Sequence, residues 1–383
     1  MAIRPNGPAG ANALNDPDAR NAPNALNDVN DVNGSNATHD GKAPDAIGPV
    51  EQRIFREGQL TIGLTLPLLP PGTAEVDLHA QLALAERADA LGFDALWIRD
   101  VPLNSPDYPD PVGHSDPWVL IGALAVRTHR IALITGAIVL TLRHPLHVAK
   151  AAASASALSG GRLVLGLGSG DRPAEYAAFG RQTEARRTLF RSHWETVAAA
   201  LGPDARVIPD LVPPRPQADD GTENAPAGRG EAARFSLLPR PVAPVPMLAV
   251  GSAGQSVDWI ARHAIGWATY HREPEVQRER YQLWRRAVER VTPDAFRSFT
   301  VAMRVELADN PRHAPEPLGL GYRVGSRALV DVLAQLRDRG THHVALNLTG
   351  YGRPQAHMLE ELAASVLPAF RPSPDAASSI PAA

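Results

Sequence analysis

The sequence predicts an α/β protein whose strands and helices alternate and close into a (β/α)8 barrel, the TIM-barrel fold. Two observations carry this prediction. Apolar segments of strand length alternate with segments of helical periodicity from Leu60 to Phe370, and such strict alternation produces a parallel sheet covered by helices. The alternation gives eight strands and eight helices, a number that favours a closed barrel over an open sheet.

The clearest unit begins with Ile131–Leu140, a β-branched and apolar run that suits a strand buried on both faces. Pro145 then suits the first turn of a helix over Leu146–Leu158, and the glycines that follow end this helix as a C-cap would. A second strand at Leu163–Leu167 leads into a glycine-rich turn. Strand, helix and strand in this order predict a right-handed βαβ unit.

The other elements follow from the same two patterns. Short apolar runs between turn residues predict the strands, and apolar positions that share one helical face predict the helices. In chain order, the remaining strands are expected at Leu60–Leu66, Phe93–Ile98, Pro246–Val250, Trp267–Tyr270, Phe299–Leu307 and His343–Leu348. The remaining helices are expected at Asp77–Leu91, from Pro117 onward, and at Arg186–Leu201, Ser256–His263, Glu275–Val291, Ser326–Arg339 and Met358–Phe370.

Residues 51–372 are expected to form the barrel domain, with an insertion within it and a tail at each end. Residues 1–50 are rich in Asn, Ala, Asp, Pro and Gly, and so few large apolar groups predict a disordered N-terminal tail. Residues 202–234 are dense in Pro, Gly and Asp, which predicts a mobile insertion, or lid, after the fourth βα unit. Residues 373–383 are expected to form a flexible C-terminal tail.

Composition excludes several classes of protein. The net charge of −3 argues against a nucleic-acid or anionic-membrane partner, and the absence of cysteine excludes disulfides and thiolate chemistry. No stretch approaches the roughly 18 consecutive apolar residues of a membrane helix, and no signal peptide is readable at the N-terminus. His144, His147, His263 and His271 are not spaced like metal ligands, so no metal site is expected. These features fit a cytoplasmic protein.

Polar residues at the carboxyl ends of the strands are the candidates for a functional site, because the ends of successive barrel strands meet on one rim. Those of the second, third and fourth strands are Asp100, Thr135, Arg143, His144 and Ser169, with Gly170 beside Ser169. Gly251-Ser252-Ala253-Gly254 follows the next strand and precedes a helix, a position that suits a phosphate, although ordinary tight turns share this pattern. A plainer interpretation is also open for three of these residues. Arg143 and His144 could simply bond the loop to a nearby carboxylate, and Asp100 could be a surface partner of Arg99.

Gly166-x-Gly168-x-Gly170 also resembles a dinucleotide fingerprint. Three βα units precede it, no clean helix opens on the last glycine, and no acidic residue ends the next strand. A nicotinamide site is therefore not expected.

The same residues carry a resemblance to a known family. Five motifs, by their order along the chain and their spacing, resemble those of the luciferase-like flavin-dependent monooxygenases. They are Gly92-Phe93-Asp94-Ala95-Leu96-Trp97, Arg143-His144-Pro145, Leu158-Ser159-Gly160-Gly161-Arg162, Gly166-x-Gly168-x-Gly170 and Gly251-Ser252-Ala253. The resemblance covers about Leu60 to Phe370 and implies a barrel that binds FMN, or in some branches F420, at its C-terminal mouth.

The resemblance also implies roles for individual residues. The segment Thr135-Gly136-Ala137 would bulge, in some relatives with a non-proline cis peptide, and support the flavin ring together with Ser169 and Gly170. Gly251, Ser252, Ala253 and Gly254 would hold the phosphate with Arg186, which shares a helix face with Phe190. Asp100, Arg143 and His144 are the catalytic candidates. One departure stands out, because several members place a histidine at the end of the second strand, where this chain has Arg99 and Asp100.

Together these observations predict a flavin-dependent oxidoreductase, and within that class a monooxygenase that uses reduced FMN and O2 on a small organic substrate. Since no nicotinamide fingerprint is present, a separate flavin reductase is expected to supply the reduced FMN, and a homodimer or homotetramer is expected. Two alternatives stay open. One is an F420-dependent oxidoreductase that transfers hydride without O2, and the other is a flavin-binding protein without turnover.

Overall fold

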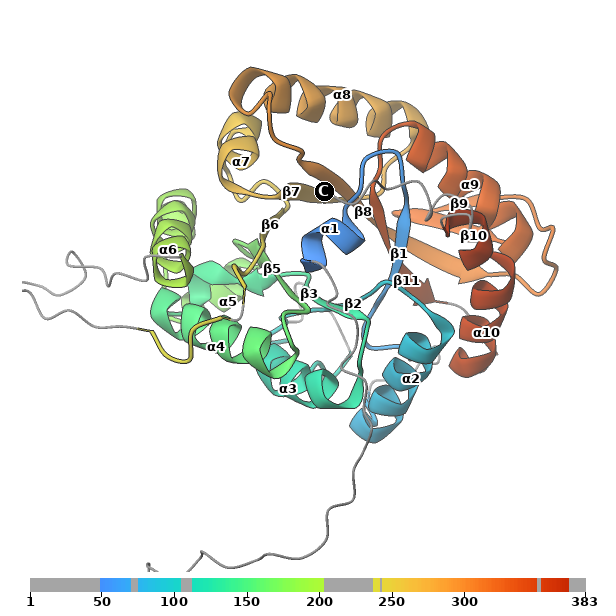
Figure 1. Ribbon diagram of the computed structural model, residues 1–383, viewed down its shortest axis with the longest axis horizontal. Helices are drawn as coiled ribbons and strands as arrows, with labels where there is room; N and C mark the ends of the chain where they lie inside the picture. The colour runs from blue at the N-terminus through green and yellow to red at the C-terminus, as the bar shows by residue number, and fades with distance from the viewer. Residues whose placement is uncertain are drawn as a thin grey trace, which may run out of the picture. The chain divides into compact units, whose positions relative to one another are not determined.

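In the computed structural model, eight parallel strands form a closed barrel, which confirms the predicted fold (Figure 1). The structure describes residues 49–69, 75–104, 112–202, 237–241, 243–349 and 353–371. The strands lie in the order β11–β1–β2–β3–β5–β6–β7–β8, and β11 pairs with β8 to close the ring, with His343 opposite Thr300. Their bounds are β1 Thr61–Thr65, β2 Ala95–Ile98, β3 Ala132–Thr135, β5 Leu163–Gly168, β6 Met247–Val250, β7 Gly266–Tyr270, β8 Ser298–Leu307 and β11 His343–Thr349.

Helices follow the strands and surround the barrel (Figure 1). They are α2 Leu78–Leu91, α3 Pro117–Arg127, α4 Pro145–Leu158, α6 Arg186–Leu201, α7 Val257–His263, α8 Pro274–Val291, α9 Ser326–Asp338 and α10 Gln355–Ser365. Local chemistry sets several of their ends. The Asp77 carboxylate accepts the N–H groups of His79 and Ala80 at the start of α2, and Gly92 ends that helix in the left-handed region.

The apolar core has two parts, because alternate residues of each strand point to opposite sides. Leu96, Leu133 and their equivalents face outward and pack under the helices. Trp97, Ile134 and their equivalents fill the inside of the barrel. A short helix, α1 Val50–Ile54, belongs to this inner cluster and lies across the centre of the ring in Figure 1. The sequence did not predict α1, because five residues are too few to show a helical period.

A polar chain runs through the inner core and is fully hydrogen-bonded. The Trp97 Nε1–H donates to His343 Nε2 at 2.8 Å, so the other ring nitrogen carries the hydrogen and donates to Thr61 Oγ1 at 2.7 Å. The Thr61 hydroxyl donates in turn to the Ile54 carbonyl at 2.7 Å. Burial lowers the pKa of His343 to about 3, so this histidine is neutral at physiological pH.

The predicted strand Ile131–Leu140 is wrong as a single element. The chain forms β3, then a cis peptide between Gly136 and Ala137, then β4 Ile138–Val139 and the 3-10 turn η1 Leu140–Leu142. β3 pairs with both β2 and β5, whereas β4 pairs only with β5. The physical reason is a contact that composition does not reveal, since the Trp97 ring occupies the space on the inner side of Gly136.

Other elements were missed because they are short or lie outside the βα alternation. These are α5 Pro173–Ala178, the turn η2 Thr183–Ala185, and the antiparallel hairpin of β9 Glu316–Leu318 and β10 Gly321–Val324. The predicted helix Met358–Phe370 is divided into α10 and the turn η4 Leu367–Phe370. The predicted tails and the insertion at 202–234 fall almost wholly outside the described residues. Within the described ranges, no helix is both long and apolar enough to cross a membrane.

We expect the free energy of unfolding to decrease as the pH falls from 6.5 towards 4. Burial lowers the pKa of His271 and His342 to about 4 and that of His343 to about 3, so below pH 6.5 only the unfolded chain takes up these three protons. Asp94 acts in the opposite direction, because burial raises its pKa to about 6 and the folded chain binds that proton first. The balance of roughly two protons corresponds to about 3 kcal/mol per pH unit.

Urea unfolding at pH 7, 6, 5 and 4.5 measures this slope. The variant His342→Asn keeps an acceptor for the Phe299 N–H, which His342 Nδ1 accepts at 3.0 Å, and should reduce the slope by about one proton. A free energy of unfolding that stays constant or increases on acidification would contradict the expectation.

Candidate active site

A cleft of about 320 Å3 opens at the C-terminal ends of the central barrel strands, where barrel chemistry is expected. It brings together the ends of β2, β5, β6 and β7 and the segment between β3 and β4. Of the predicted site residues, those that line the cleft are Asp100, Gly136, Ala137, Ser169, Gly170, Arg186, Gly251, Ser252, Ala253 and Gly254.

The turn Gly251–Gly254 forms one end of this cleft and has a backbone suited to a phosphate. Gly251, Ala253 and Gly254 all have positive φ, and the turn is closed by the Gln255 N–H, which donates to Ser252 O at 2.8 Å. No hydrogen bond within the described part of the chain uses the N–H groups of residues 252–254. Three successive N–H groups left without acceptors form a nest for an anion.

Gln255 ties this turn to α6. Its Nε2 donates to the carbonyls of Arg187 at 2.8 Å and Ala253 at 3.2 Å, while its Oε1 accepts from Arg191 Nε at 3.2 Å. Phe190 and Trp194 anchor α6 in the core, so the first turn of α6 is held beside the phosphate turn. Arg186 lies in that first turn and lines the cleft, so a cation and the three free N–H groups share one cleft.

The Gly136–Ala137 segment forms a second wall. A Cβ on Gly136 would lie 2.4 Å from Trp97 Cε3, so the indole ring supports this peptide from inside the barrel. On the neighbouring strand a Cβ on Gly168 would lie 3.2 Å from the Ala137 Cβ. We call the segment Gly136–Ala137, which lines the cleft together with Gly168, the flat wall.

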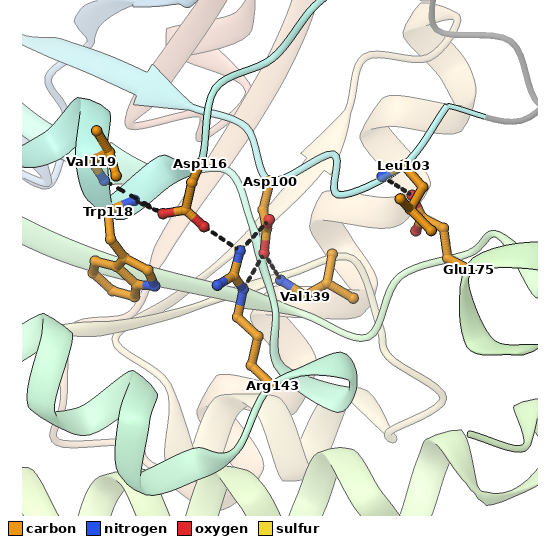
Figure 2. A network of polar contacts seen from close by, with 8 residues as sticks. All are labelled: Asp100, Leu103, Asp116, Trp118, Val119, Val139, Arg143 and Glu175. Atoms are coloured by element: carbon orange, nitrogen blue, oxygen red, sulfur yellow. Dashed lines mark hydrogen bonds and ion pairs between the residues drawn. The ribbon is translucent and has the colours of Figure 1, made fainter. Parts of the chain in front are cut away.

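Asp100 and Arg143 form an ion pair on the rim, and Figure 2 shows the guanidinium lying between Asp100 and Asp116. Arg143 Nε donates to Asp100 Oδ2 at 2.9 Å and Nη2 to Oδ1 at 2.8 Å, while the Val139 N–H donates to Oδ2 at 3.0 Å. The Asp100 side chain is only 1% exposed. Both carboxylate oxygens are therefore occupied, and Asp100 fixes β4, the strand that follows the flat wall.

Three predicted residues do not line the cleft. Arg143 bonds to Asp100 but is not part of the lining. Thr135 is completely buried, and its hydroxyl donates to the Gly166 carbonyl at 2.7 Å. His144 is exposed, and its Nδ1 accepts the Leu146 N–H at 3.3 Å as the N-cap of α4. It lines a separate hollow beside the cleft rather than the cleft itself.

Sequence reasoning missed the contribution of α5. Glu175 is buried at the edge of the cleft, 3.6 Å from Arg172 Nη1, and its Oε1 accepts the Leu103 N–H at 3.4 Å (Figure 2). Desolvation raises the pKa of this carboxyl. Tyr270 at the end of β7 also lines the cleft. The signal available in the sequence was Pro173, a residue favoured in a first helical turn, directly after Gly170-Asp171-Arg172.

Among the residues that the structure describes, no group of three or more His, Asp or Glu side chains is placed to hold a metal ion. The chemistry available at the rim is instead a nest of N–H groups with an arginine, a flat backbone wall, one buried ion pair and one buried carboxyl. A phosphate-bearing, planar cofactor matches this set.

Comparisons with known proteins identify the family of the chain. A family model described as luciferase-like monooxygenase matches residues 63–375. An uncharacterized protein of Mycobacterium tuberculosis (strain ATCC 25618 / H37Rv) is 33% identical over 168 residues, which are 42% of this chain and 52% of that protein. The chain thus spans about half the length of the curated relatives it matches.

Two solved structures share the fold with different cofactors. The oxygenating constituent of 3,6-diketocamphane monooxygenase from Pseudomonas putida, in complex with FMN, has a TM-score of 0.60 at 15% identity and covers 81% of this chain and 98% of its own. An F420-dependent secondary alcohol dehydrogenase, in complex with an F420–acetone adduct, has a TM-score of 0.61 at 14% identity and covers 82% and 100%. Since the family model matches most of its length, the chain belongs to the luciferase-like monooxygenase family, a family of oxidoreductases.

Proposed function

We propose that this protein is an FMN-dependent monooxygenase that receives reduced FMN from a separate reductase and oxidises a small organic substrate with O2. The observation that carries the proposal is the single cleft that joins the phosphate turn Gly251–Gly254, Arg186 and the flat wall at Gly136–Ala137. Family membership supports an oxidoreductase, and the FMN complex of the similar Pseudomonas putida monooxygenase supports FMN as the cofactor.

Bound reduced FMN would supply the reaction with O2, and the residues of the chain would bind, orient and shield it. The N–H groups of Ser252, Ala253 and Gly254 would hold the phosphate with Arg186. Gly136 and Ala137, supported by Trp97, would carry the ring. Asp100 and Arg143 would keep β4 and the rim in place, and Glu175 would present a buried carboxyl at the edge of the cleft.

The partners in this proposal are a small organic substrate, O2 and a flavin reductase. A cytoplasmic location and a homodimer or homotetramer complete it.

An F420-dependent hydride-transfer enzyme is the second candidate, because the similar secondary alcohol dehydrogenase carries F420 in the same fold. Titration of the purified chain with FMN and with F420, followed by absorbance, separates the two. The proposal requires FMN to bind more tightly than F420 and FMN reduced in situ to be reoxidised by O2 with oxygenated product. Tighter binding of F420 together with hydride transfer to a substrate would favour the second candidate. Binding of flavin without product would leave a flavin-binding protein.

Replacing Arg186 by alanine is expected to weaken FMN binding about ten- to hundredfold. The change removes charge-assisted hydrogen bonds to the phosphate worth roughly 1.5–3 kcal/mol. Fluorescence titration of FMN measures the dissociation constant. Arg262→Ala, an exposed arginine on α7 away from the cleft, is the matched control and should bind FMN like the wild type. An unchanged dissociation constant for Arg186→Ala would remove this residue from the phosphate site.

A further inference from the structure

A second hollow lies beside the cleft and is the larger of the two. This outer hollow has a volume of about 620 Å3, within the range of roughly 300–1,000 Å3 typical of small-molecule sites. It shares Asp100 and Val101 with the cleft, so the two spaces meet at the rim. None of the residues that form the phosphate turn or the flat wall lines it. The cleft accounts for a cofactor, and the outer hollow is left for a different molecule.

Its walls are apolar and partly aromatic. Trp118 at the start of α3, Phe179 after α5, and Leu142, Val148 and Ala151 around the start of α4 contribute the apolar surface. Trp118 and Arg143, both labelled in Figure 2, line this hollow. Aromatic faces of this kind favour a ring that can pack against them.

The carboxylates and the arginine that line the outer hollow are paired with one another. Its described carboxylates are Asp100 and Asp116, and Arg143 pairs with both. The other oxygen of Asp116 accepts the Trp118 and Val119 N–H groups as the cap of α3. A charged ligand would lose its hydration and would have to compete with these existing pairs for a counter-ion, which is costly in a partly buried site.

One polar group in the lining has no partner. The Ser115 hydroxyl is buried and makes no hydrogen bond to any described residue. His147 brings an imidazole to the same space. A hydroxyl and an imidazole can each donate to, or accept from, a carbonyl or hydroxyl oxygen of a ligand.

We propose that the outer hollow binds the substrate, and that the substrate is an uncharged aromatic or alicyclic compound bearing a carbonyl or hydroxyl group. That the ligand is a substrate rests on the proposed function, whereas its chemical class rests on the residues that line the hollow. The ring would pack against Trp118 and Phe179, and its oxygen would bond to Ser115. Its position against Asp100 and Val101 places it at the edge of the cofactor cleft.

Calorimetric titration with three naphthalene probes tests the ligand class, with and without saturating FMN. We expect 2-naphthol to bind, and both 2-naphthoate and 2-naphthylmethylammonium to bind at least about tenfold more weakly. Trp118→Ala should weaken 2-naphthol binding about tenfold, because an aromatic contact and its buried area are lost. Val119→Ala changes the neighbouring, solvent-facing residue of α3 and should leave the affinity unchanged.

Ala151→Phe is a second test that does not depend on the stability of the Trp118 variant. It fills the outer hollow from α4, and a folded Ala151→Phe protein should no longer bind 2-naphthol. The inference is overturned if either ion binds as tightly as 2-naphthol, or if 2-naphthol binding survives both substitutions. If FMN does not bind while 2-naphthol binds in a Trp118-dependent way, the proposed function fails and the assignment of the hollow stands.

Discussion

Asp100→Ala is expected to lower the free energy of unfolding by about 3–5 kcal/mol, the range for breaking a buried ion pair from one side. The substitution leaves Arg143 with only the solvent-accessible Asp116, 3.1 Å away, and leaves the Val139 N–H without an acceptor. The side chain of Asp116 is 44% exposed, so its attraction for Arg143 is screened by water. Urea unfolding at pH 7 measures the loss.

Asp116→Asn is the matched control. It removes the exposed half of the same network but keeps a side-chain oxygen that can cap α3, so its cost should stay below about 1 kcal/mol. The pair of variants also tests the catalytic role predicted for Asp100 and Arg143. A stable Asp100→Ala protein that binds FMN normally but forms no product would show that Asp100 acts in the reaction. A large loss of stability accompanied by weaker FMN binding would show that it positions the rim.

The barrel was accessible from the sequence because its signals are repeated and local. Each strand is a short apolar run and each helix has an amphipathic face, so an error in one element leaves the alternation intact. The division of Ile131–Leu140 was not accessible in this way. It depends on Trp97, which lies more than thirty positions earlier in the chain and touches Gly136 only once the barrel has formed.

In the candidate site, too, features with a local sequence signal could be predicted, and features that depend on the folded chain could not. The turn at Gly251–Gly254 could be found because glycine after a strand is a local signal, and the structure places it in the cleft. The orientation of a side chain is not a local property. Thr135 ends its strand facing the Gly166 carbonyl, and His144 caps a helix, although both sit at the expected strand ends. Glu175 reaches the cleft from a helix too short to be recognised.

Asp100 illustrates the difference between position and role. The topological argument placed it on the same rim as Arg143, and the structure has the two side chains in contact. Arg143 does bond to a nearby carboxylate, as its plainer interpretation expected. The carboxylate of Asp100 pairs with Arg143 instead of the expected Arg99. Sequence spacing alone could not choose between these partners, because both arginines lie within reach of a strand end.

Gly136→Val is expected to weaken FMN binding at least about a hundredfold and to lower the free energy of unfolding by about 1–3 kcal/mol, the usual cost of overpacking. A Cβ at this position would lie 2.4 Å from Trp97 Cε3 and 3.2 Å from Cζ3. The indole cannot move away easily, because its Nε1–H donates to His343 and the two rings stack with centroids 5.7 Å apart. The backbone at residues 136–137 must therefore shift outward, into the space that the cofactor ring would occupy.

Gly122→Ala supplies the control for glycine replacement as such. Gly122 lies in α3, a Cβ there meets nothing within 4 Å, and the change should leave FMN binding unaltered while stabilising the helix by roughly 0.5–1 kcal/mol. Gly136→Ala carries the smallest possible side chain and should fall between the wild type and Gly136→Val in both measurements. Fluorescence titration of FMN and urea unfolding on the four proteins give the order. If Gly136→Val binds FMN as tightly as Gly122→Ala, the flat wall does not support the flavin, and the ring must lie elsewhere on the rim.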